Sequence, residues 1–388
     1  MKSEKWTAAS GRSAVATASS RRSGAAPVVR VGVEEEYLVV DPVSRQLSTR
    51  ADKVVTEAAA QLGDRVTTEL TRYQVEVRTH PHTSLTDLGD DLRHIRRAVA
   101  QAAARLGLRI ISSGTPVLGQ HTPPPLTAGD RYAQSLATFR ALDHEQSVCA
   151  CHVHVEMPDL PTALAVSNHL RPWLPALIAL SGNSPYWNGQ DTGYDSWRTL
   201  TWGRWPVAGP PPYFESAAHY EDLLGHLLSS HTLLDRGGLY WDIRPSHHVP
   251  TLEIRVADAA PTVDDTLLLA AAVKGLAGTA LDAVRDGQPG PRLQAEMLRA
   301  ACWRAARDGV KGQSIDLASS GLEPASRRLE QLWDTATPVL EPGEVPAVDS
   351  ARRDLAARGN GADRQRAAYR HRHNHLDVVD HLVQQATA

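Results

Sequence analysis

Three consecutive glutamates interrupt a stretch that otherwise has the composition of a β-strand. Residues 31–40 are rich in valine, which favours a strand, yet Glu34, Glu35 and Glu36 lie in the middle. Side chains alternate along a strand, so Glu34 and Glu36 point to one face and Glu35 to the other. Two carboxylates on one half-buried face repel each other unless a cation lies between them, and a divalent metal ion would serve. A solvated strand face is the alternative that this segment alone leaves open.

A second acidic stretch covers residues 67–77. Its second half alternates as a strand does, with Gln74 and Glu76 on one face and valines on the other. Glu69 precedes it. These acids occupy positions where a packed strand would normally carry apolar residues.

Residues 147–156 contain a Cys-x-Cys-His-x-His string, which resembles a zinc-binding pattern. If the segment is a strand, however, Cys149 and Cys151 point to one face and His152 and His154 to the other. We therefore interpret the cysteines as small core residues. The histidines are either a metal ligand and a phosphate contact, or hydrogen-bonded residues of a sheet.

Residues 239–246 and 251–258 are predicted to form two strands joined by a turn. In the second strand Glu253 and Arg255 share the face opposite a clean apolar stripe. They form either a surface salt bridge or a metal ligand beside a phosphate-binding guanidinium.

The stretch 187–212 is rich in tryptophan, glycine and proline, which predicts no regular element. Arg198 and Arg204 are embedded among its tryptophans. We favour a substrate-binding loop over an ordered surface loop with stacked arginines, because long structureless segments in compact domains are usually functional.

The rest of the chain is mainly helical, and together these patterns predict an α+β fold. Predicted helices cover residues 53–62, 84–107, 160–180, 262–284, 292–307, 323–340 and 363–385. If the polar-faced strands line one antiparallel sheet, the helices pack on its apolar face. Carboxylate-rich sites suit Mg²⁺ or Mn²⁺, which commonly hold nucleotide phosphates, so the chemistry indicated is phosphoryl transfer from ATP.

Composition limits the alternatives. The 388 residues are 42% hydrophobic and 22% charged, with a net charge of −3, so we expect no binding to nucleic acid or membranes. Three cysteines argue against a disulfide framework, and no apolar run approaches the roughly 20 residues of a membrane helix. We therefore expect a cytoplasmic protein.

Residues 1–27, dominated by Ala, Ser and Arg, are predicted to be an unstructured extension, and 28–388 a single catalytic domain.

The chain contains a series of short motifs whose order and spacing along the sequence resemble those of the carboxylate–amine ligases of the glutamate–cysteine ligase type 2 family. The motifs are Gly32-x-Glu34-x-Glu36, Glu69-x(4)-Gln74-x-Glu76, Cys149-x-Cys151-His152-x-His154, Asn183-Ser184-Pro185, Arg244-Pro245-Ser246, Glu253-x-Arg255-x-Ala257-Asp258 and Gly361-Ala362-Asp363-Arg364-Gln365. The resemblance runs from about Val31 to the C-terminus. It implies a catalytic sheet related to that of glutamine synthetase and guanido kinases: curved and antiparallel, with one metal-lined face.

The resemblance also implies roles for individual residues. Arg255 and His154 would steady the transferring phosphoryl group, Arg244 would help to bind ATP, and Arg198 or Arg204 would bind the acidic substrate. The Mg²⁺ (or Mn²⁺) ligands would be Glu34, Glu36, Glu69, Glu76, His152 and Glu253.

The implied reaction forms an amide through an acyl phosphate, with glutamate or a similar acid and cysteine or another amine as substrates. The sequence leaves the physiological amine open, and a homo-oligomer as well. Two alternatives are an ATP:guanidino phosphotransferase and a non-catalytic nucleotide or metal binder.

Overall fold

The computed structural model describes residues 29–145 and 147–387. The predicted unstructured segment, 1–27, lies outside the described residues. The assignment of 28–388 to one domain stays a prediction.

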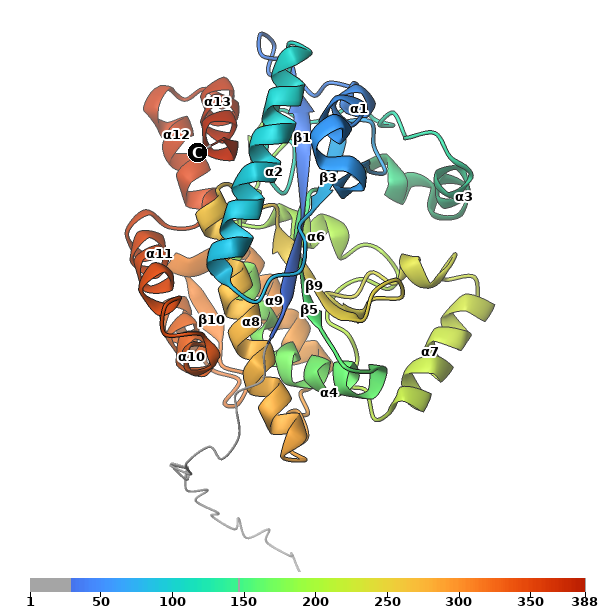
Figure 1. Ribbon diagram of the computed structural model, residues 1–388, viewed down its shortest axis with the longest axis vertical. Helices are drawn as coiled ribbons and strands as arrows, with labels where there is room; N and C mark the ends of the chain where they lie inside the picture. Colours follow the sequence, from blue (N-terminus) through green and yellow to red (C-terminus); the bar gives the residue numbers. More distant parts are fainter. Residues whose placement is uncertain (1–28, 146, 388) are drawn as a thin grey trace, which may run out of the picture.

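An antiparallel sheet runs through the centre of the molecule (Figure 1). Its strand order is β2-β3-β1-β5-β9-β8, with β4 paired to the far end of β1. Every pairing is antiparallel, as predicted. The strands are β1 (Val31–Val40), β2 (Val66–Thr68), β3 (Gln74–Arg78), β4 (Arg109–Ile111), β5 (Ala150–Glu156), β8 (Ile243–Pro245) and β9 (Thr251–Asp258). Two small sheets pair β6 (Tyr186–Trp187) with β7 (Gln190–Asp191) and β10 (Gln313–Ile315) with β11 (Leu322–Pro324).

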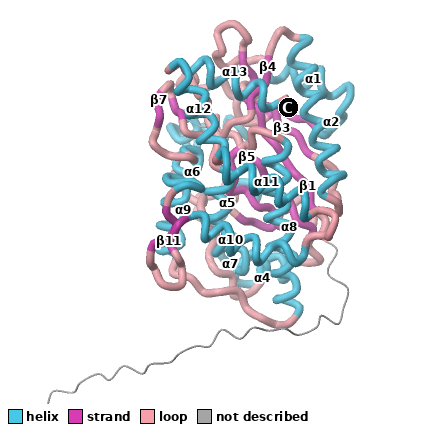
Figure 2. Tube along the Cα trace, turned by 90° about the vertical axis from the view of Figure 1, so that its left-hand side faces the viewer, coloured by secondary structure: helices cyan, strands magenta, loops and turns pink. Residues whose placement is uncertain are grey.

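Helices lie around this sheet in both views (Figure 1, Figure 2). They are α1 (Ala51–Leu62), α2 (Leu85–Arg105), α3 (Asp130–Phe139), α4 (Leu160–Leu170), α5 (Leu174–Ser181), α6 (Trp197–Trp202), α7 (Ala217–Ser229), α8 (Val263–Arg285), α9 (Ala295–Asp308), α10 (Ala325–Ala336), α11 (Val345–Arg358), α12 (Gly361–Arg372) and α13 (His375–Ala386). Mixed helices and an antiparallel sheet confirm the α+β class.

The two faces of the sheet differ as the sequence alternation predicts. Val33, Val153 and Ile254 pair across β1, β5 and β9 and belong to the main hydrophobic core, together with residues of α4, α5 and α8. Cys149 and Cys151 are also buried in core clusters, which confirms their structural interpretation. The opposite face of the same strands carries the acids and histidines.

Glu35, which lies between Glu34 and Glu36 in the sequence, faces the helices and is fully buried. Its carboxylate accepts two hydrogen bonds from the Arg96 guanidinium of α2, at 2.9 and 2.5 Å. Tyr37 and Thr266 donate to it as well, each at 2.5 Å. The remaining Arg96 donors reach backbone carbonyls that include that of Pro261. Burial favours the neutral acid, but the charge of Arg96 overcomes it and lowers the pKa of Glu35.

Helix α8 is a long apolar helix of the main core. By length and mean hydropathy, 1.6, it could cross a membrane, contrary to the expectation from the apolar runs. Yet 67% of its most apolar window is buried inside the molecule. It begins with a capping box, in which Thr262 and Asp265 each bond the other's backbone N–H. This is the environment of a central core helix.

Several predicted elements are corrected. The predicted helix 363–385 is two helices, α12 and α13, because His373 adopts a left-handed conformation (φ 53°) and Asn374 caps the next helix. The stretch 187–212 does contain a regular element, α6, capped by Ser196. Helices α3, α7 and α11 have no counterpart among the predicted elements.

Replacing Arg96 with methionine should destabilise the protein by about 3 kcal/mol, because the Glu35 carboxylate is then buried without its cation. Urea unfolding followed by circular dichroism measures this. The control is Arg93→Met on the same helix, where an exposed pair with Asp90 is worth less than about 1 kcal/mol. Equal stabilities of the two variants would contradict this account of the Glu35 environment.

Candidate active site

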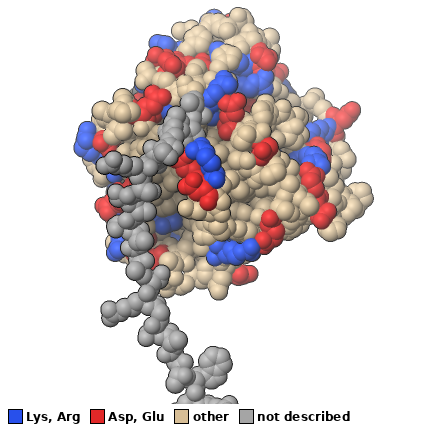
Figure 3. Space-filling view, turned by 60° about the horizontal axis from the view of Figure 1, so that its bottom comes forward, with Lys and Arg blue, Asp and Glu red and all other residues tan. Residues whose placement is uncertain are grey.

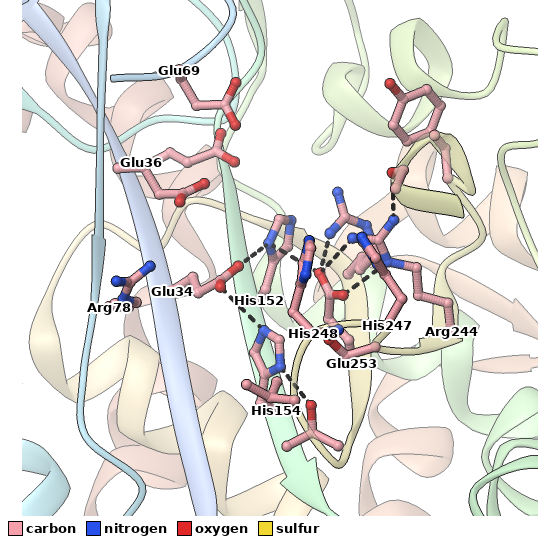
Figure 4. A pocket seen from close by; sticks show the side chains of 18 of the residues that line it. Glu34, Glu36, Glu69, Arg78, His152, His154, Arg244, His247, His248 and Glu253 are labelled. Carbon is pink, nitrogen blue, oxygen red and sulfur yellow. Dashed lines mark hydrogen bonds and ion pairs between the residues drawn. The ribbon is translucent and has the colours of Figure 1, made fainter. Parts of the chain in front are cut away.

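A pocket of about 760 Å³ opens over the polar face of the sheet. Figure 4 shows side chains from β1, β5 and β9 converging on it, with the Glu36 and Glu69 carboxylates facing each other at one side. The residues predicted as metal, phosphate or ATP ligands all line it: Glu34, Glu36, Glu69, Glu76, His152, His154, Arg244, Glu253 and Arg255.

Strand register brings these residues together. Glu34 of β1 pairs with His152 of β5, and Glu36 pairs with Glu76 of β3. On the other side of β5, His154 pairs with Glu253 of β9. Directly opposed side chains in an antiparallel pair lie within about 5.5 Å at Cβ, so each pairing places two polar groups side by side.

Glu36, Glu69 and Glu76 form a group that we call the acidic cluster. One carboxylate oxygen from each lies within 4.8 Å of the other two. Burial, followed by the charge of Glu69, raises the pKa of Glu36 to about 8, and burial with the charges of all its acidic neighbours raises that of Glu76 well above its usual value. The charges of Arg198 and Arg255 lower the pKa of Glu36 but do not outweigh burial and Glu69, and three such carboxylate oxygens suit Mg²⁺ or Mn²⁺.

The second group centres on Glu34. One of its oxygens lies 3.0 Å from His152 Nδ1, and the other lies 3.4 Å from His154 Nε2. Burial opposes ionisation, but the hydrogen bonds to both histidines hold the pKa of Glu34 well below its usual value. Burial and the nearby Arg255 lower the pKa of His152 to about 4, so this imidazole is neutral at pH 7 and able to act as a ligand.

Glu253 lies between two guanidinium groups. Arg244 Nε donates to it at 2.8 Å, and Arg255 Nη1 donates to its other oxygen. Despite burial, these charges keep the pKa of Glu253 low. An oxygen of Glu253 also lies within 4.8 Å of ligand atoms of Glu34 and His154, but a metal there would compete with two arginines. In this arrangement Glu253 orients Arg255, and its role as a metal ligand stays a prediction.

Arg198 and Arg204 are not among the residues that line the pocket. The Arg198 side chain is buried and donates to the backbone carbonyls of Arg255 (3.1 Å) and Val256 (3.3 Å). Arg204 Nε donates to the Thr201 carbonyl. The arrangement therefore gives no support to a direct contact between either arginine and the acidic substrate. These hydrogen bonds tie the buried Arg198 to strand β9, and its role as a substrate ligand stays a prediction.

Two sets of residues that line the pocket were not predicted from the sequence as site residues. Arg131, Tyr132, Ser135 and Phe139 lie on one face of α3, at positions i, i+1, i+4 and i+8. That helical spacing was the available signal. Arg30, Arg78, His247 and His248 also line the pocket. Those residues carried no pattern that distinguishes them from ordinary surface groups.

Part of the motif resemblance comes from a buried polar network rather than from the pocket. Asp258 accepts hydrogen bonds from Ser184 Oγ at 2.6 Å, Ser196 Oγ at 2.7 Å and the Asn183 backbone N–H at 2.8 Å. Gln365 of α12 donates to Asn183 Oδ1 at 2.7 Å. These motif residues join α12 and the end of β9 and so support the site from outside it.

Charge on the face of the molecule that Figure 3 shows is mixed. In Figure 3 acidic and basic side chains are interspersed over the visible face, with no field of one sign.

Comparison with known proteins agrees with the motif resemblance. The family model described as glutamate–cysteine ligase family 2 matches residues 30–382. Two similar relatives, both named "Putative glutamate–cysteine ligase 2-1", come from Saccharopolyspora erythraea and Nocardia farcinica. The first is 45% identical over 91% of this chain and 93% of its own length, and the second 43% identical over 91% and 92%.

Solved structures share the fold at low sequence identity. The chain is similar to the glutamate–cysteine ligase of Francisella tularensis, crystallised in complex with AMP, with a TM-score of 0.64 and 14% identity over 93% of this chain and 89% of that one. A bifunctional glutathione synthetase from Pasteurella multocida gives a TM-score of 0.65 at 15% identity, over 92% of this chain and 52% of that one.

Replacing Glu69 with glutamine should weaken Mn²⁺ binding about tenfold or more, because the acidic cluster loses one charged oxygen ligand. Isothermal titration calorimetry measures the change. Glu156→Gln is the matched control, since Glu156 also lines the pocket but pairs with Arg30 and belongs to neither candidate metal group. Equal Mn²⁺ affinities for the two variants would contradict the assignment.

The Mn²⁺ affinity measured in this titration should depend on pH. Protons and cations compete for the carboxylates, and the pKa of Glu36 is raised to about 8. Cation affinity should therefore rise as the pH increases from 6 towards 8 and level off above that value. An affinity that is constant over this range would argue against binding at Glu36.

Proposed function

The chain belongs to glutamate–cysteine ligase family 2 and is an ATP-dependent carboxylate–amine ligase; from this premise we propose how its pocket carries out the reaction. The observation that carries the proposal is the register of β1, β3 and β5, which gathers carboxylates and imidazoles from separate parts of the chain on one face.

The reaction has two steps. The carboxylate of the acid attacks the γ-phosphorus of ATP, and ADP leaves. The acyl phosphate that forms is then attacked at its carbonyl carbon by the amine, the amine loses a proton, and inorganic phosphate leaves with the former carboxylate oxygen. Carboxylates are poor acyl donors, and phosphorylation supplies the leaving group. The protein contributes position and charge, and no nucleophile.

The acidic cluster fits a divalent cation, Mg²⁺ or Mn²⁺, and Glu34 with His152 offers further ligands on the same face. When bound, the metal would neutralise part of the negative charge of the ATP phosphates. On this proposal, the polar face of the sheet is the metal-lined face that the resemblance implies.

Arg255 is the group we assign to the transferring phosphoryl. Glu253 fixes its guanidinium, and its Nε is buried without a hydrogen-bond partner among the described residues. That donor is therefore available to a phosphate oxygen. His154 is the second candidate: burial lowers its pKa, but the hydrogen bond to Glu34 outweighs burial and raises it, which favours the cationic form that attracts phosphate.

The substrates we propose are glutamate or a similar acid and cysteine or another amine, because the relatives are named for that pair. We also propose that residues 28–388 act as one catalytic domain, which the family match over residues 30–382 supports, and that the protein is cytoplasmic. Its oligomeric state would follow from sedimentation of the purified chain.

Purified protein with Mg-ATP should release phosphate only when both an acid and an amine are supplied. This follows because the acyl phosphate is consumed by the amine. A coupled phosphate assay with glutamate and a panel of amines, including cysteine, measures it. A stable phosphorylated acceptor formed without release of phosphate would instead favour a phosphotransferase.

Arg255→Lys should lower kcat about 100-fold with little change in fold, since a lysine cannot keep both the Glu253 contact and a phosphate contact. Arg30→Lys is the matched control, because Arg30 is a partly exposed residue at the edge of the same pocket, paired with Glu156. If the two variants turn over ATP equally, Arg255 does not contact the phosphoryl group.

A further inference from the structure

Strand β9 is irregular at the residue that we assign to the transferring phosphoryl group. Its register with β5 shifts between Cys151 and Val153. Opposite His152, β9 has two residues, Arg255 and Val256, where a regular ladder has one. Such a β-bulge bends its strand, and bulges recur beside active sites, where they re-aim a side chain. The direction of the Arg255 side chain therefore depends on what holds the bulge in place.

The guanidinium of Arg198, from α6, bonds both residues of this bulge. Its Nη2 donates to the Arg255 carbonyl at 3.1 Å, and its Nη1 donates to the Val256 carbonyl at 3.3 Å. Consecutive carbonyls of a regular strand point to opposite edges, so one guanidinium can reach both only where the strand is irregular. The planar fork of donors on Arg198 thus fits the bulge.

A second set of hydrogen bonds fixes Arg198 itself. Its backbone N–H donates to Ser184 Oγ at 3.0 Å, and Ser184 Oγ in turn donates to Asp258, the last residue of β9. Ser196, which caps α6, donates to the same carboxylate. Helix α6 and strand β9 are therefore joined twice, through the Asp258 carboxylate and through the Arg198 guanidinium.

The Arg198 side chain lies behind the pocket rather than in it. It is 3% exposed and does not line the pocket, whereas Arg255 does. Its Cζ lies 6.0 Å from the centre of the Trp202 ring, and Trp202 lines the pocket. Any effect of Arg198 on a ligand in the pocket therefore passes through its neighbours, and Arg255 is the pocket residue whose backbone it bonds.

We propose that Arg198 is a positioning residue for phosphoryl transfer: it fixes the β-bulge so that the Arg255 guanidinium points at the transferring group. Glu253 bonds the tip of the Arg255 side chain, and Arg198 bonds its backbone. The inference rests on the ligase function proposed above and deepens it. It differs from the role of substrate ligand that the motif resemblance implies, because a substrate ligand acts on the KM for the acid, whereas a positioning residue acts on kcat.

Arg198→Met removes both donors and keeps an unbranched side chain. With Mg-ATP, glutamate and the most active amine of the panel, kcat should fall about tenfold, and the KM for ATP and for glutamate should change by less than about twofold. In the background of Arg255→Lys the same substitution should cause no further loss, because Arg198 acts through Arg255. An unchanged kcat, a rise in the KM for glutamate alone, or losses that add in the double variant would each overturn the proposal.

Arg171→Met is the matched control. Arg171 is also buried (2% exposed), donates to a backbone carbonyl, that of Pro211, at 2.8 Å, and lies 6.0 Å from an aromatic ring, that of Tyr213. Its loss should lower the stability to urea and leave kcat unchanged. An equal loss of kcat in the two methionine variants would indicate a general loss of stability and overturn the positioning role.

Circular dichroism shows whether Arg198→Met folds. If it does not, Arg198→Lys takes its place under the same criteria, since lysine keeps the buried charge but lacks the planar fork that bonds two carbonyls at once.

Failure of the ligase function itself is a separate outcome. If no pair of acid and amine releases phosphate, crystal structures of the unaltered protein and of the folded Arg198 variant compare the position of Arg255 without any turnover. A rearranged bulge with a displaced Arg255 guanidinium would support the positioning role. An Arg255 guanidinium that keeps its place in the pocket and its contact with Glu253 would overturn it.

Discussion

Like charges held side by side on one face of an antiparallel sheet are the constraint on which the site depends. Glu36 and Glu76 are opposed across β1 and β3, and Glu69 lies beside them, so that one carboxylate oxygen from each lies within 4.8 Å of the other two. Without a cation this arrangement is costly, and the raised pKa of Glu36 is the direct sign of that cost. Nothing in the packing of the apolar face requires these acids. A fold that keeps them supports our proposal that the acidic cluster holds a cation.

On the opposite face of the sheet, a buried carboxylate is paired with a cation. Glu35 lies between Glu34 and Glu36 in sequence but is matched by Arg96, Tyr37 and Thr266 on the helical side. One side of β1 thus holds a satisfied ion pair, while the other holds acids open to a ligand. The contrast separates charge that supports the structure from charge that serves chemistry.

Much of this could be predicted because side-chain alternation in strands is a local property. Alternation alone separated Glu34 and Glu36 from Glu35, and the cysteines from His152. The partners could not be predicted in the same way, because strand register and helix docking are set by contacts between distant segments. The burial of Arg96 beside Glu35 and the hydrogen bonds of Arg198 to the backbone of β9 depend on such contacts. The aromatic lining from α3 was missed for the same reason.

Diffraction at the manganese absorption edge tests the central claim most directly. Crystals of the protein grown with Mn²⁺ and a non-hydrolysable ATP analogue should show an anomalous peak bonded to oxygens of Glu36, Glu69 and Glu76, with analogue phosphate next to it. Nucleotide bound elsewhere, or nucleotide in the pocket with no anomalous density at these three carboxylates, would contradict the account.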